Sequence, residues 1–128
     1  EIAILLVPTE KKLYKTILER EQLNVCDIYL SKYPSGNNFE AVSNLREKYF
    51  FIQAYNMAAA QFSDTALRNY LRIYPDGSYK QKAEDAIEIA AWQKARYENT
   101  AASYKEYLTS YPNGKAVKMA KEKLAEKK

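Results

Sequence analysis

One eight-residue pattern, Tyr-Leu-x-x-Tyr-Pro-x-Gly, occurs three times in the 128 residues of the chain. Its copies are YLSKYPSG (29–36), YLRIYPDG (70–77) and YLTSYPNG (107–114). Apolar residues precede each proline at helical spacing, as Leu67, Tyr70 and Tyr74 do in the second copy. Because the residue before a proline is pushed out of the α region, each of these helices should end at its Tyr-Pro. The pattern therefore predicts a helix end followed by a turn, repeated three times.

The residues that follow each proline have predicted roles in the turn. The three closing glycines are Gly36, Gly77 and Gly114. Glycine lacks a Cβ, so we expect these residues to adopt the positive φ that a sharp reversal needs. Asn37 and Ser78 come directly after the first two turns and are predicted to cap the next helix by accepting hydrogen bonds from its free amides. Lys115, at the third turn, cannot accept such a bond.

Helical sequence fills the intervals between the copies, with polar breaks near residues 61–63 and 98–100. Pro34 and Pro75 are 41 residues apart, and Pro75 and Pro112 are 37 apart. The difference of four is close to one α-helical turn of ~3.6 residues, so the longer interval lengthens a helix without rotating its apolar stripe. Helix pairs repeated at this period stack into an α-solenoid, because one pair cannot bury its apolar face alone.

The predicted fold is therefore all-α, a right-handed α-solenoid of about three helix pairs with a C-terminal capping helix. The pairs are placed at 10–33, 37–74 and 78–111, and the capping helix at 115–127. The apolar stripe of that last helix consists of Ala116, Val117, Ala120 and Leu124. The repeat domain thus spans 10–128. Residues 1–9 precede it, and their segment IAILLV (2–7) either packs on the body or is the remnant of a truncated element.

The repeat resembles the tetratricopeptide family. In the second half of that motif, a small residue lies twelve positions before the proline and a large apolar residue eight before it. The matching residues are Ser63, Leu67 and Pro75, then Thr100, Tyr104 and Pro112. The Tyr-Pro-x-Gly ending resembles a subgroup found in bacterial envelope proteins, such as the outer-membrane assembly lipoprotein and the Tol–Pal coordinator. Over about residues 10–114, the resemblance implies a superhelix that binds protein partners in the bacterial periplasm or at the outer membrane.

The net charge of +4 belongs to the end of the chain. Residues 115–128 hold six Lys and two Glu, whereas residues 1–114 hold fourteen basic and fourteen acidic residues. A nucleic-acid-binding domain usually carries a basic stripe over its folded surface, so we expect no nucleic-acid partner. No apolar run approaches the ~18 residues of a membrane-spanning helix, so we expect no membrane insertion by this segment.

Residues that carry chemistry are scarce. The chain has no His and one Cys, which excludes a His-based nucleophile pair and a zinc-binding Cys/His cluster. All three Gly fall in the turns, so no glycine-rich phosphate loop can be drawn. Cys26 occupies the register of Leu67 and Tyr104, and it is predicted to be a buried packing thiol. We therefore expect no catalytic residues, no metal and no cofactor.

Aromatic residues on the first helix of each pair are the candidates for binding. Tyr14, Tyr55 and Trp92 each lie twenty residues before a proline. They either pack between helices or line a groove, where Tyr and Trp are favoured anchors. The predicted concave binding surface joins two matching sets of three residues, which are Lys48, Phe51 and Tyr55, and Asp85, Trp92 and Arg96.

The run YFFIQAY (49–55) is apolar on too much of its circumference for an ordinary surface helix. Either the segment 2–7 covers its second face, or that face contacts a partner. The sequence thus favours a non-catalytic scaffold that binds a peptide or helix of a partner protein. The alternative is a structural spacer, docking arm or self-association module of a larger protein, which leaves homo-oligomers open.

Overall fold

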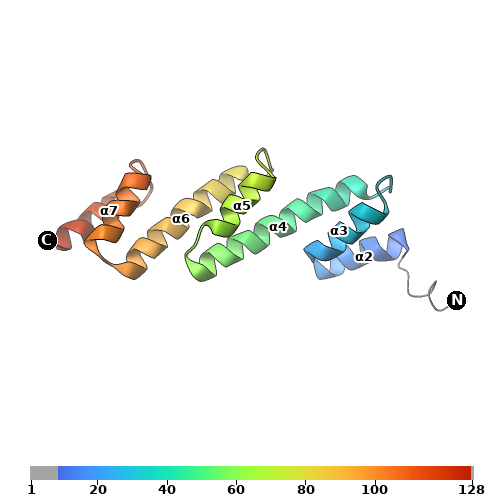
Figure 1. The fold of residues 1–128 in the computed structure, drawn as a ribbon, viewed down its shortest axis with the longest axis horizontal. Helices are drawn as coiled ribbons and strands as arrows, with labels where there is room; N and C mark the ends of the chain where they lie inside the picture. The colour runs from blue at the N-terminus through green and yellow to red at the C-terminus, as the bar shows by residue number, and fades with distance from the viewer. Residues whose placement is uncertain (1–8, 128) are drawn as a thin grey trace. The chain divides into compact units, whose positions relative to one another are not determined.

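The computed structural model describes residues 9–127, and over these residues the chain is all-α, with seven helices and no strand (Figure 1). The all-α prediction is therefore confirmed. The helices are α2 (Glu10–Arg20), α3 (Leu23–Lys32), α4 (Phe39–Gln61), α5 (Thr65–Ile73), α6 (Lys80–Glu98), α7 (Ala101–Ser110) and α8 (Val117–Glu126). Each predicted pair contains two helices, and both predicted breaks fall between helices. The segment 2–7 lies outside the described residues.

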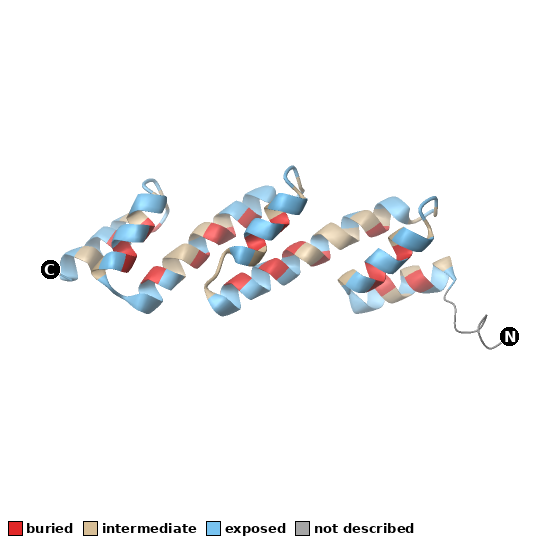
Figure 2. Ribbon diagram, in the orientation of Figure 1, coloured by how far each residue is buried: buried red, intermediate tan, exposed pale blue. Residues whose placement is uncertain are grey.

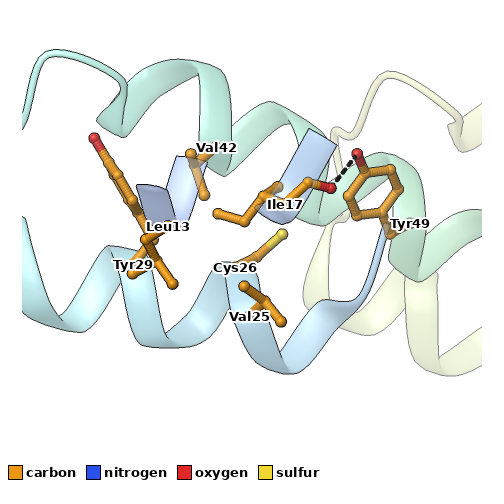
Figure 3. Packing of buried hydrophobic residues seen from close by; sticks show 7 residues of the cluster. All are labelled: Leu13, Ile17, Val25, Cys26, Tyr29, Val42 and Tyr49. Carbon is orange, nitrogen blue, oxygen red and sulfur yellow. Dashed lines mark hydrogen bonds between the residues drawn. The ribbon is translucent and has the colours of Figure 1, made fainter. Parts of the chain in front are cut away.

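The chain divides after Ile52, inside α4, into two compact units. In the first unit, α2, α3 and the start of α4 surround one apolar cluster (Figure 3). Its buried members are Leu13, Ile17, Val25, Cys26, Tyr29, Val42 and Tyr49. Tyr49 lies at one end of this cluster (Figure 3). Its hydroxyl donates a hydrogen bond to the carbonyl oxygen of Ile17 at 3.4 Å, so the buried hydroxyl has a partner.

The second unit contains the end of α4 and the helices α5 to α8. Here α6 packs against α5 and α7, and α7 packs against α8. Buried and exposed positions alternate along these helices, as expected for helices with one apolar face (Figure 2). On α8 and its N-cap, Ala116 and Ala120 are buried, and Val117 and Leu124 pack partly buried against the same cluster. The predicted apolar stripe of the last helix is therefore confirmed.

A tyrosine hydroxyl closes each of the three repeat turns in the same way. The first Tyr of every copy is almost fully buried, and its hydroxyl accepts a hydrogen bond of 3.1 Å from the amide nine residues later. The three bonds run from Asn38 to Tyr29, from Tyr79 to Tyr70 and from Ala116 to Tyr107. Each bond satisfies one of the free amides at the start of the next helix.

The expectation that the glycines adopt a positive φ is wrong, because no glycine in the described residues does so. At Gly36 and Gly114, glycine is required for space instead. A Cβ on Gly114 would lie 2.5 Å from the Tyr107 hydroxyl, and one on Gly36 would lie 2.7 Å from the Tyr29 hydroxyl. The turn itself is closed by a bond from each glycine amide to the carbonyl of the Tyr before the proline, such as Gly114 to Tyr111 at 3.0 Å.

The predicted caps also need adjustment. The N-cap of α6 is Tyr79, one residue after Ser78, and its side chain makes no capping bond. Ala116 likewise caps α8 without a side-chain bond. Asn37 lies two residues before α4 begins. In each of the three turns, a buried tyrosine hydroxyl accepts a hydrogen bond from one amide at the start of the next helix.

Left-handed residues occur at the other turn, between the two helices of a pair. Glu21, Phe62 and Asn99 have φ values of 54°, 51° and 52°. Each lies thirteen residues before the proline of its copy. Glu21 and Asn99 are the C-caps of α2 and α6, and their amides bond to the last turn of the helix. The repeat therefore places its positive φ within each pair, where no glycine occurs.

Candidate functional site

A shallow apolar groove lies in the second unit between the end of α4 and the middle of α6. Its volume is about 60 Å³. We call it the alanine-floored groove, and its residues are Tyr55, Ala58, Ala59, Ala86, Ile89, Ala90 and Gln93. Three of its alanines, Ala58, Ala86 and Ala90, are buried, whereas Tyr55 and Ile89 are each 47% exposed. The groove therefore presents two large apolar side chains to solvent above a floor of small ones.

The six predicted binding residues are distributed over both units. Lys48 and Phe51 belong to the first unit, where Lys48 is exposed and Phe51 is only 8% exposed. The other four belong to the second unit. Asp85 is half-buried and accepts a hydrogen bond of 3.0 Å from the Gln81 side chain. Of the six, only Tyr55 lines the alanine-floored groove.

Trp92 packs between helices. Its ring lies 5.9 Å from the Tyr104 ring and 5.3 Å from the Tyr107 ring, measured between centroids. The Arg96 guanidinium lies 6.0 Å from the centre of the Trp92 ring, within range of a cation–π contact. Tyr14, in the same register, packs against the first unit's cluster. Of the three aromatics in this register, Tyr55 is therefore the exposed one.

A second, larger groove was not foreseen from the sequence. It is also within the second unit and has a volume of about 700 Å³. The turn after α4, the start of α5, the second half of α6 and one side of α7 line it. We call it the polar groove, because five charged residues line it, namely Asp64, Arg68, Lys94, Glu98 and Glu106. The lining comes from three separate stretches of sequence, 61–68, 91–98 and 103–111, so no local sequence pattern identifies it.

One pair of these charges is already matched. The Nε atom of Arg68 donates to an Asp64 carboxylate oxygen at 2.6 Å. This hydrogen bond raises the pKa of the Arg68 guanidinium. Burial raises the pKa of the Tyr111 hydroxyl, which also lines this groove.

Cys26 has the surroundings of a packing residue. Its side chain is fully buried in the first unit's cluster, as predicted. Burial, followed by the nearby charge of Asp27, raises the pKa of its thiol. Because the thiolate is the reactive form, this environment disfavours nucleophilic chemistry. Over residues 9–127, no three His, Cys, Asp or Glu side chains gather where they could hold a metal ion.

None of the described helices has an apolar stretch long enough to cross a membrane. Comparisons with protein-family models, with curated proteins and with solved structures found no significant match. The resemblance to tetratricopeptide repeats therefore depends on the residues of the repeat alone.

Proposed function

We propose that the chain is a non-catalytic interaction scaffold, which binds a peptide or helix of a partner protein in the alanine-floored groove. The repeated helix pairs and Tyr-Pro-x-Gly turns support a tetratricopeptide-like solenoid as its framework. The observation that carries the proposal is the exposure of Tyr55 and Ile89 on two neighbouring first helices, above buried alanines. A location in the bacterial envelope is supported by the resemblance only.

The energetics favour an apolar partner at this place. Full burial of a Leu- or Phe-sized side chain contributes about 1.5–3 kcal/mol, so covering two half-exposed ones contributes about that much in total. Alanines on the floor let a partner backbone approach closely. An amphipathic helix that places apolar side chains at positions i, i+3 and i+4 fits such a surface. This gain is modest, which suggests that flanking polar contacts also contribute to affinity.

The proposal is tested by selecting phage-displayed helical peptides on the purified chain. Peptides that bind the alanine-floored groove should lose affinity about tenfold or more when Ile89→Asp places a charge on its rim, because that charge would be buried unpaired. The matched control is Met119→Asp on α8, which changes an apolar residue of similar exposure, 48%, outside the groove. This control should leave peptide binding unchanged.

Two results would count against the proposal. If the selected peptides bind the wild-type and Ile89→Asp chains equally well, the groove is not their site. If the chain sediments as a dimer that Ile89→Asp dissociates, the same surface serves self-association, and the alternative of a self-associating module takes its place. Circular dichroism of both variants checks that the helices persist.

A further inference from the structure

We propose that the polar groove is a second binding site, and that it takes a basic side chain from an extended segment of a partner protein. The groove and the alanine-floored groove occupy different faces of α6. Lys94 and Glu98 line the polar groove, whereas Ile89 and Gln93 line the other. At about 100° per residue along a helix, these two sets point in clearly different directions. The two sites can therefore be altered separately.

The charges of the polar groove favour a cation. Asp64 forms an ion pair with Arg68, so these two charges cancel in the net charge of the lining. The remaining charged residues of the lining are Glu98, Glu106 and Lys94. Within residues 9–127, neither of these two carboxylates has a hydrogen-bonding or ion-pair partner. The groove thus has one uncompensated negative charge, and an incoming guanidinium or ammonium group would meet two available carboxylates and one competing cation.

An aromatic face lies beside these carboxylates. Phe62 lines the groove, and its ring centre is 5.7 Å from that of Tyr97, with the planes inclined at 52°. Tyr97 directly precedes Glu98 and is 78% exposed, the largest value among the exposed large hydrophobic side chains of the described residues, and it lies next to the lining rather than in it. A cation held near a carboxylate and over an aromatic ring gains from both contacts. This combination distinguishes the groove from an ordinary solvated helix surface.

The size of the groove indicates a segment rather than a single small molecule. Its volume of about 700 Å³ is several times that of one guanidinium group. Side chains with hydrogen-bonding groups, including Gln61 and Ser110, complete the walls. Such groups can bond to the backbone of an extended peptide while the carboxylates bind its basic side chain.

The test uses two synthetic peptides and the complete chain labelled with ¹⁵N. The first is acetyl-Gly-Arg-Gly-Arg-Gly-amide, and the second replaces each Arg by citrulline, its neutral isostere. We expect the arginine peptide to shift amide signals of residues 61–68, 94–98 and 103–111. The citrulline peptide should bind at least about tenfold more weakly, since a hydrogen bond to a charged group contributes roughly 1.5–3 kcal/mol.

Three variants locate the interaction. The double variant Glu98→Gln with Glu106→Gln should weaken binding of the arginine peptide about tenfold. The control, Glu84→Gln with Glu122→Gln, changes two exposed carboxylates outside the groove and should leave binding unchanged. Lys94→Glu removes the competing cation and should strengthen binding. Because Lys94→Glu predicts a gain, it also serves as the test if the double Gln variant fails to fold.

The proposal is overturned if both peptides shift the same signals equally, if the shifts are spread over the whole surface, or if Lys94→Glu leaves affinity unchanged. Ile89→Asp should not affect the arginine peptide. Failure at one groove is therefore distinguishable from failure at the other.

Discussion

Each buried tyrosine of a repeat turn connects helices through one oxygen atom. The Tyr107 hydroxyl donates to Glu88 on α6 at 3.4 Å and accepts from the amide of Ala116 at 3.1 Å. Tyr29 likewise donates to Glu10 at 2.6 Å. A hydroxyl has one proton and two lone pairs, so it can serve both contacts. At Gly36 and Gly114, the position of this oxygen, rather than the backbone conformation, explains why glycine closes the turn.

The glycine and tyrosine of one turn should therefore be energetically coupled. Gly114→Ala is expected to destabilise the chain by about 1–3 kcal/mol, because its Cβ would overlap the Tyr107 hydroxyl. Tyr107→Phe removes that hydroxyl and should cost about 1 kcal/mol for the lost hydrogen bonds. In the double variant the overlap is relieved, so its loss should be clearly smaller than the sum. Urea denaturation of the four chains measures this coupling, and strict additivity would contradict the steric explanation.

The left-handed residues lead to a second prediction. Glu21 holds a φ of 54°, a conformation that costs a residue with a side chain about 1–2 kcal/mol. Glu21→Gly should therefore stabilise the chain by about 1 kcal/mol. Asn99→Gly is the matched comparison, since Asn99 also accepts a hydrogen bond of 2.7 Å from the Tyr104 hydroxyl. Thermal unfolding should show a gain for Glu21→Gly and none for Asn99→Gly; equal gains would mean that this hydrogen bond contributes nothing.

At the level of helices, the sequence was a reliable guide to number and order. The apolar stripes and the three prolines define where α3, α5 and α7 end. The left-handed turns at Glu21 and Phe62 could not be foreseen, because neither residue type favours that conformation. The steric reason for a glycine in the turn could not be predicted from the sequence either, because the position of a buried tyrosine hydroxyl is known only once the helices have packed.

The attachment of α8 should depend on Glu88. One oxygen of its carboxylate accepts from the Lys115 amide at 2.9 Å and from the Tyr107 hydroxyl. Glu88→Ala removes both bonds, and we expect amide hydrogen exchange in α8 to accelerate about tenfold or more, with α2 and α3 unchanged. Glu84→Ala, an exposed position on the same helix, is the control. Equal acceleration in α2 and α3 would mean that Glu88 acts on the whole chain rather than on α8.

For the whole molecule, the sequence predicted the fold class better than the surface. Helical periodicity shows which residues share a face, but not which neighbour covers that face. Trp92 illustrates this difference, because α7 brings Tyr104 and Tyr107 against its ring. Tyr55, at the same register position, is 47% exposed. The polar groove was missed for a related reason, since its walls come from segments that only folding brings together.

The central claim is that the alanine-floored groove holds an apolar partner segment. The most direct measurement is a double-mutant cycle between Ile89→Ala and an alanine substitution of the main apolar residue in a selected peptide, followed by calorimetry. If the two side chains are in contact, their effects on binding should be non-additive by at least about 0.5 kcal/mol. If the alanine substitution of every apolar peptide residue changes the binding free energy by the same amount in the wild-type and Ile89→Ala chains, the peptide does not contact Ile89. The proposed binding site is then wrong.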